Sequence, residues 1–199
     1  MTRSDAVKIL SENLENRNMA KHCLASGAVM RGLAQKVLEN PSEEEVLAWE
    51  LAGLLHDADA EKSSQEQQGA VVGEWFSASS ADKGKYAGQL PSKYQEQIIH
   101  AMAAHNEMTG AECESPMDWA LYAGEKLTGL IVATTLVLPS KKISAVTPDM
   151  VMRRFKEKSF AKGAKRENIE QGTRLRLSLE EFVKICLEAM QEISHELGL

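Results

Sequence analysis

Aromatic residues are scarce in this chain of 199 residues: Phe, Trp and Tyr together make up 5% of it. Ala, Leu, Glu, Lys, Gln and Met are plentiful instead, and these residue types favour helices over sheets. The chain is long enough to bury a core of its own without disulfides or structural metals. We therefore expect an all-α fold, built as one domain or at most as one domain with a helical appendage.

Cysteine is also rare. The three cysteines, Cys23, Cys113 and Cys186, are far apart, and no CxxC pair occurs. This spacing excludes a zinc ribbon and a disulfide framework, so we expect reduced, chemically idle thiols. The first residues, "MTRSDAVKIL", lack the apolar stretch of a signal peptide, and no apolar run reaches membrane-spanning length. We expect a cytoplasmic protein without a membrane partner.

Positive charge is in short supply overall, since the net charge is −6. This balance argues against general nucleic-acid binding, which depends mainly on Lys and Arg. The segment 141–166 is an exception, with nine Lys or Arg and two acids. It could form a phosphate-attracting rim or a docking face for an acidic partner. A plain solvated surface of short helices is the simpler interpretation.

Start and stop signals divide the chain into successive helices. Pro41 ends one helix, and Ser42 with Glu45 forms a capping-box pattern that starts the next. Segment 77–91 is rich in small and polar residues, which predicts a surface loop. The expected helices cover approximately residues 4–18, 19–39, 42–57, 64–76, 91–106, 116–138, 147–158, 165–174 and 178–197.

Helical periodicity indicates which histidines face the interior, because side chains advance about 100° per residue. His22 shares a stripe with apolar residues of its helix. His56 and Asp57 lie at the inner end of the helix that carries "LAGLLHD". His105 is predicted to face the core, whereas His100 projects to the opposite side and is expected to face water.

A carboxylate is predicted inside the most apolar helix, 116–138. Glu125 lies in line with Leu121 and Thr128, while Lys126 is expected to project elsewhere. An ionised carboxylate in such a place is costly unless it is paired, hydrogen-bonded or bound to a cation. The convergence of these acids and histidines allows either a satisfied polar core or a site for a divalent transition metal, which mixed His and carboxylate ligands suit.

The order of these residues resembles the H…HD…D pattern of the HD superfamily of metal-dependent phosphohydrolases, and in particular a bacterial subgroup of predicted HD-domain hydrolases. The stretches "KHCLASGAVMRGLA", "LAGLLHDAD" and "HNE…ALYAGEKLTGLIVATTLVLPSKK" carry the resemblance. It implies an HD-type metal-binding helical domain over residues 1–140. It also implies a C-terminal helical extension, 141–199, packed on that domain.

The resemblance implies one divalent metal ion, of which Mn, Fe, Zn, Ni and Mg all remain open. The implied ligands are His22, His56, Asp57 and Glu125. Relatives with two metals add histidines between the HD pair and the last acid, and His105 occupies one such place.

The chain departs from the family pattern at two positions. Glu125 stands where the family usually has Asp, and its longer side chain requires the metal or the helix to shift by about an ångström. Gln68, in "EQQG", stands where relatives with two metals have a second histidine. Its amide can form hydrogen bonds but is a poorer metal ligand than imidazole.

The resemblance implies hydrolysis of a small phosphate ester, such as a nucleotide, by metal-activated water. Asp57 would orient or deprotonate the water, His105 would hold the phosphate or protonate the leaving oxygen, and Gln68 would hydrogen-bond the substrate. Two alternatives stay open. One is a non-catalytic HD-fold protein that binds a nucleotide or a partner at an eroded site, and the other is a structural helical module. The oligomeric state is left open.

Overall fold

Two long helices, α2 and α6, form the centre of the fold. The computed structural model describes residues 1–77 and 84–199, and in these residues it contains helices and turns but no strand, as predicted. The elements in chain order are α1 (Arg3–Asn13), α2 (Arg17–Val37), α3 (Glu43–Leu55), α4 (Ala70–Phe76), α5 (Gln95–Ala104), η1 (Glu107–Thr109), α6 (Pro116–Leu136), η2 (Ile143–Ala145), α7 (Pro148–Lys156), α8 (Arg166–Glu170), η3 (Gln171–Leu175), α9 (Leu179–Glu192) and α10 (Ser194–Leu197).

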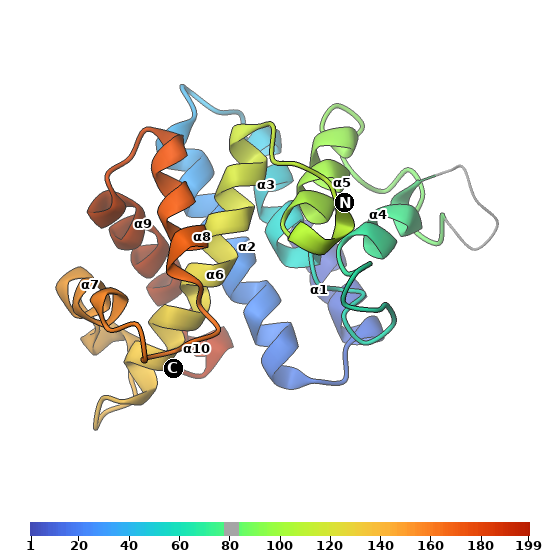
Figure 1. Cartoon of the computed structure of the whole chain (residues 1–199). Coiled ribbons are helices and arrows are strands. Elements are labelled where there is room, and N and C mark those ends of the chain that lie inside the picture. The colour runs from blue at the N-terminus through green and yellow to red at the C-terminus, as the bar shows by residue number, and fades with distance from the viewer. Residues whose placement is uncertain (78–83) are drawn as a thin grey trace.

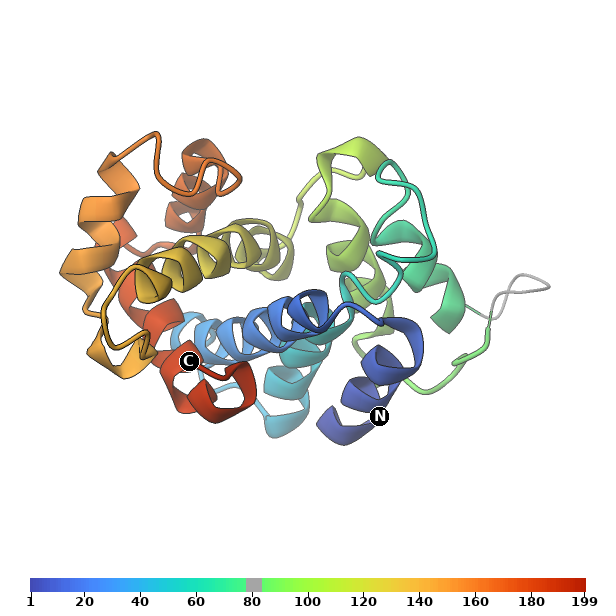
Figure 2. The same ribbon diagram turned by 90° about the horizontal axis from the view of Figure 1, so that it is seen from below.

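The other helices flank this central pair on two sides. α1, α4 and α5 lie on one side of α2 and α6, and α7, α8 and α9 lie on the other (Figure 1). Seen from below, α2 and α6 run side by side across the middle (Figure 2), and residues of the two helices are in contact. Because α3 also packs against α2 and α5, four helices surround one interior.

Local hydrogen bonds explain where the helices begin. Ser42 caps α3 by accepting the Glu45 N–H at 3.1 Å, which is one half of the predicted capping box; the structure of the described residues shows no return bond from the Glu45 carboxylate. Ser115 caps α6 in a reciprocal capping box with Asp118, and Pro116 supplies a first residue that has no N–H to satisfy. These caps set the start of the two helices that later carry His56 and Glu125.

The first predicted helix was misplaced by a few residues. Thr2, rather than Ser4 or Asp5, is its cap, because the Thr2 hydroxyl accepts the Asp5 N–H and the Asp5 carboxylate accepts the Thr2 N–H. It ends at Asn13 instead of near residues 16–18. Asn16 is already the cap of α2, where its side chain accepts the Asn18 N–H at 2.9 Å.

Three other predicted boundaries also differ. The helix predicted from residue 64 begins only at Ala70, because Gly69 has a φ of +88°, which no right-handed helix contains. Residues 91–94 form a turn before α5 instead of its first turn. The last predicted helix is divided into α9 and α10. Of the predicted surface loop 77–91, residues 78–83 lie outside the described residues.

Two glycines allow α2 and α3 to pack closely. A Cβ on Gly53 would lie 2.5 Å from the Ser26 carbonyl oxygen, and one on Gly27 would lie 2.6 Å from Leu54 Cγ. Real Cβ atoms do not approach other atoms so closely, so both positions require glycine. The close approach brings the His22 turn of α2 next to the C-terminal end of α3.

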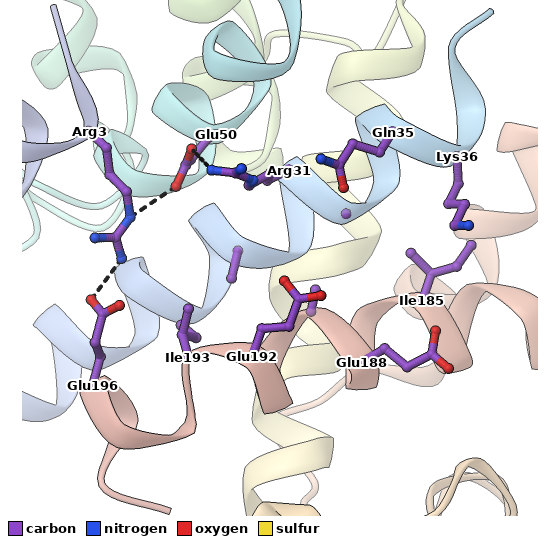
Figure 3. A pocket seen from close by; sticks show the side chains of 13 residues that line it. Arg3, Arg31, Gln35, Lys36, Glu50, Ile185, Glu188, Glu192, Ile193 and Glu196 are labelled. Carbon is purple, nitrogen blue, oxygen red and sulfur yellow. Dashed lines mark hydrogen bonds and ion pairs between the residues drawn. The ribbon is translucent and has the colours of Figure 1, made fainter. Parts of the chain in front are cut away.

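Ion pairs connect the two ends of the chain. The buried Glu50 carboxylate accepts hydrogen bonds from Arg3 at 3.0 Å and Arg31 at 3.4 Å, and Arg3 also pairs with Glu196 of α10 at 2.7 Å (Figure 3). These groups line a cavity of about 310 Å³ between α2 and α9. The network holds the C-terminal helices against α1, α2 and α3.

Arg166 has a structural role inside the basic segment 141–166. Its guanidinium donates to six backbone carbonyls around the end of α7 and the following loop, at 2.6–3.2 Å. It is therefore committed to holding that loop and is not free for a phosphate. No helix in the described part of the chain is both long and apolar enough to cross a membrane.

Candidate metal centre

Four helices direct the predicted site residues into one interior. His22 lies in the second turn of α2, and Glu125 lies in the middle of α6. His56 and His105 cap the C-terminal ends of α3 and α5, and Asp57 follows His56. All five side chains point inward as the periodicity predicted. Four are buried, and the His22 side chain is 26% exposed.

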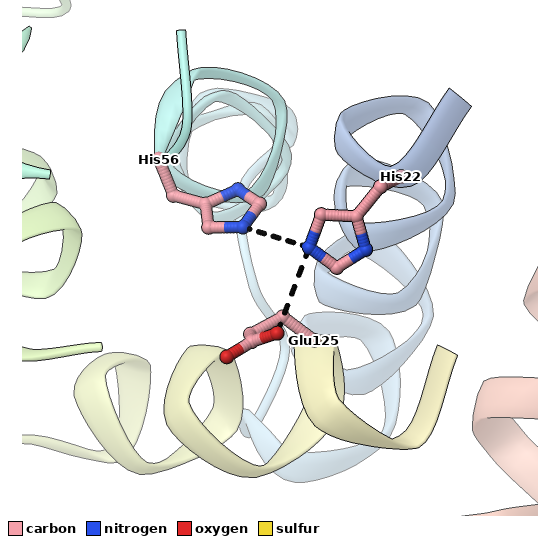
Figure 4. Close-up of side chains that lie close together, drawn as sticks. All are labelled: His22, His56 and Glu125. Carbon is pink, nitrogen blue, oxygen red and sulfur yellow. Dashed lines mark hydrogen bonds and ion pairs between the residues drawn. The ribbon is translucent and has the colours of Figure 1, made fainter. Parts of the chain in front are cut away.

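The four predicted metal ligands lie close together. His22 Nε2 lies 3.2 Å from His56 Nε2 and 3.6 Å from both Asp57 Oδ2 and Glu125 Oε2. His56 Nε2 lies 3.2 Å from Asp57 Oδ2. Figure 4 shows the two imidazoles directed at each other, with the Glu125 carboxylate beneath them. The structure thus brings together all four residues.

Backbone carbonyls determine the tautomers of two histidines. His56 Nδ1 lies 2.8 Å from the Gly53 carbonyl oxygen, and His105 Nδ1 lies 2.6 Å from the Met102 carbonyl oxygen. A carbonyl oxygen can only accept, so each Nδ1 carries a hydrogen and donates it. In the neutral ring, Nε2 then carries the lone pair. His105 Nε2 faces Asp57 Oδ1 at 3.3 Å.

Thr128 determines the tautomer of His22, which also carries its hydrogen on Nδ1. The Thr128 hydroxyl donates to the Glu125 carbonyl oxygen at 2.7 Å, so its oxygen is left to accept from His22 Nδ1 at 3.2 Å. His22 therefore also presents its Nε2 lone pair to the interior. Hydrogen bonds of this kind, which hold the outer ring nitrogen, are typical of metal-binding histidines. Sequence periodicity placed Thr128 beside Glu125 but did not reveal this role.

The acids and the lone pairs together favour positive charge at their meeting point. Burial opposes ionisation of the Asp57 carboxyl and so raises its pKa. The charge and hydrogen bonds of His56 and His105 outweigh this effect, and the pKa of Asp57 lies well below its usual range. Burial also opposes charge on His56, yet Asp57 and Glu125 raise its pKa. Burial, with the neighbouring His56, lowers the pKa of His22. Of the two facing imidazoles, His56 therefore takes up a proton more readily than His22.

Lys126 corrects one expectation from the sequence. It was predicted to project away from Glu125, but its ammonium group forms an ion pair with Glu125 Oε1. A lysine has a long, flexible side chain that can curl back over its neighbour, and helical periodicity describes only the direction of the first carbons. Lys126 therefore belongs to the site.

Gln68 takes part in the site through Asp57. Its amide nitrogen donates to Asp57 Oδ1 at 2.7 Å. The next residue, Gly69, has no room for a side chain, because a Cβ there would lie 2.1 Å from the Met102 carbonyl oxygen. This close contact holds the turn that carries Gln68 against the end of α5, beside His105.

Asp59 was missed by the sequence analysis. Its fully buried carboxylate accepts the Gly69 N–H at 3.0 Å and the Val72 N–H at 3.0 Å. It thereby fastens the start of α4, and with it Gln68, to the segment that follows the HD pair. The available signal was an acid between two alanines in "HDADA", which helical periodicity does not interpret because α3 has already ended.

We predict that Asp59→Asn loosens the Gln68 turn. The new amide would direct an N–H toward backbone N–H groups, and losing a charged acceptor costs about 1.5–3 kcal/mol of unfolding free energy. Denaturant unfolding measures this loss, and bound metal per chain should stay unchanged because Asp59 is not one of the predicted ligands and its carboxylate accepts from backbone N–H groups. If Asp59→Asn had the same free energy of unfolding as the wild type, the hydrogen bonds of Asp59 would not be what holds the Gln68 turn in place.

His100 lies outside the site. Its side chain is 38% exposed, and its Nδ1 lies 3.1 Å from Asp118 Oδ2, at the capping box of α6. The prediction separated it correctly from His105, but it contacts Asp118 as well as solvent.

The donor set fits a divalent cation. Metal–ligand distances of about 2.1 Å place neighbouring ligand atoms about 3.0–3.4 Å apart in tetrahedral and octahedral sites. The separations of 3.2–3.6 Å from His22 to the other three predicted ligands, and from His56 to Asp57, are close to this range. Two overlapping groups could hold a metal, His22–His56–Glu125 and His56–Asp57–His105. Both need the single Nε2 lone pair of His56, so the described residues suit one ion better than two.

The comparisons with known proteins agree with this geometry. The model of the HD domain matches residues 19–135, which is more than half of the chain and includes His22, His56, Asp57, His105 and Glu125. Neither the curated proteins nor the solved structures provide a match. HD domains typically bind divalent metals and are found in metal-dependent phosphohydrolases. By this match the chain belongs to the HD domain family.

Proposed function

We propose that this protein is a phosphohydrolase that uses one divalent metal ion to hydrolyse a small phosphate ester, such as a nucleotide. His22, His56, Asp57 and Glu125 would hold the ion. The observation that carries the proposal is that three imidazole Nε2 lone pairs and two carboxylates share one largely buried interior. Lys126 offsets part of the negative charge through Glu125, and a divalent cation would bind the Nε2 lone pairs and the Asp57 carboxylate.

When bound, the ion lowers the pKa of water toward neutrality and offsets negative charge on phosphoryl oxygens. The chain supplies the remaining groups. Asp57 is held from one side by Gln68 and faces His105, so its oxygens have a fixed direction in which to orient or deprotonate the attacking water. The second N–H of the Gln68 amide is available to the substrate.

His105 and Lys126 are suited to the phosphate. Because His105 Nδ1 is bound to a backbone carbonyl, only its Nε2 can hold the phosphate or protonate the leaving oxygen. Lys126 can transfer its ammonium group from Glu125 to a phosphoryl oxygen once a metal takes up the Glu125 carboxylate. The exchange would replace one ion pair with another.

We also propose that residues 1–140 are the HD-type metal-binding unit and residues 141–199 an extension packed on it. Support comes from the family match, which ends at residue 135, and from α9, which packs along α2. Limited proteolysis that cuts first near residue 140 would support this boundary. Early cleavage inside residues 19–135 would contradict it.

Elemental analysis of untagged protein tests the proposed function. We expect about one transition metal per wild-type chain and none in Asp57→Ala, because the loss of this carboxylate leaves the imidazoles without their acidic partner. Asp149→Ala is the matched control, since Asp149 is exposed on α7 and far along the chain from the site. It should retain both metal and hydrolysis.

A phosphate-ester screen on the same three proteins separates the alternatives. Hydrolysis by wild type and by Asp149→Ala, but not by Asp57→Ala, supports the phosphohydrolase. Tight ligand binding without product would favour the non-catalytic binding protein. Hydrolysis retained in Asp57→Ala would refute the proposed mechanism.

A further inference from the structure

We propose that the groove between α2, α6 and α10 binds the organic group of the phosphate ester. This inference rests on the proposed function and adds a binding site for a compact, largely apolar group of at most nucleoside size. The groove has a volume of about 490 Å³. Its lining includes His22 and Thr128, so it begins directly behind one of the proposed metal ligands.

The walls of the groove are mainly apolar. Ala25 contributes from α2, Val132 and Leu136 from α6, and Leu197 from α10. Leu136 is 49% exposed, although large apolar side chains are usually covered. From Thr128 to Leu136 the helix rises about 12 Å, at about 1.5 Å per residue. The groove is therefore long enough along α6 for a group of nucleoside length that extends away from His22.

Polar groups are few, as in sites that bind a small organic molecule. Asn18 offers an amide that can pair with a polar edge of the ligand, and Lys21 offers a positive charge. Within residues 1–77 and 84–199, Lys21 forms no ion pair with a carboxylate. Its ammonium group lies beside Gly198, at the side of the groove.

Gly129 gives the floor of the groove its open space. A Cβ at this position would meet no atom within 4 Å, although the residue lies inside a helix where glycine is normally unfavourable. A larger side chain at residue 129 would therefore fill the groove without disturbing the core. This makes Gly129→Leu a direct and structurally mild test.

The test measures binding of two phosphonates that cannot be hydrolysed. One is methylphosphonate, and the other is the methylene phosphonate analogue of adenosine 5′-monophosphate. Calorimetric titration of metal-loaded wild type should show at least ten-fold tighter binding of the nucleoside compound, which corresponds to about 1.4 kcal/mol. Gly129→Leu should abolish this difference and leave the affinity for methylphosphonate unchanged.

A matched pair of wall variants provides the control. Leu136→Ala should weaken the nucleoside phosphonate several-fold, whereas Val137→Ala should have no effect. Val137 is similarly exposed but lines a different cavity, with Met150 and Arg154. Thermal unfolding of each variant checks that the fold is intact.

The outcomes distinguish this inference from the proposed function. Equal affinity of wild type for both phosphonates, or a difference that survives in Gly129→Leu, overturns the groove and leaves the phosphohydrolase intact. Binding of the nucleoside compound that depends on Gly129 but not on metal supports the groove and overturns the metal-dependent function. If neither phosphonate binds to wild type, both proposals fail.

Discussion

Metal-stripped protein is expected to gain about 4 kcal/mol in unfolding free energy when a divalent metal is added at about a thousand times its Kd. The ion would bind only the folded state, where His22, His56, Asp57 and Glu125 converge. For a chain of this size, this gain corresponds to a rise in Tm of about 8–16 °C. Thermal unfolding with Mn²⁺, Zn²⁺, Ni²⁺ and Mg²⁺ in turn also ranks the candidate metals.

The same titration on Asp57→Ala separates specific binding from general salt effects. The variant should show no metal-dependent rise in Tm, because one carboxylate and the anchor for Gln68 are gone. A structural helical module predicts equally flat curves for wild type and variant. An equal rise in both proteins would mean that the metal binds elsewhere.

Gly53→Ala is expected to destabilise the protein by about 3 kcal/mol, despite the higher helix propensity of alanine. The new methyl group would lie 2.5 Å from the Ser26 carbonyl oxygen, so backbone atoms of α2 would have to move. That movement would also separate His22 from His56, and metal affinity should fall together with stability. Denaturant unfolding and metal titration of the same variant measure the two effects.

Gly129→Ala is the matched control for this substitution. It also replaces a glycine inside a helix, but its methyl group enters open space. We expect a gain of about 0.5–1 kcal/mol from helix propensity. If Gly53→Ala were as stable as Gly129→Ala, close packing of α2 on α3 would not be what brings the two histidines together.

Much of the candidate site follows from the sequence because helices repeat regularly. Periodicity is a local property, and it identified His22, Glu125 and His105 as inward-facing residues before any contact between helices was known. The family resemblance then grouped these residues with the HD pair. The all-α class also follows locally, from composition and from caps such as Ser42.

Only the tertiary structure decided how these groups act on one another. The Nε2 tautomer of His22 depends on Thr128, which is 106 positions further along the chain. The ion pair of Lys126 depends on a curled side chain, and the placement of Gln68 depends on Asp59 and on a glycine with positive φ. Such features arise from contacts between elements and from departures from regular helix. A pattern that assumes a continuous helix therefore identifies the residues of this site but not their hydrogen bonds.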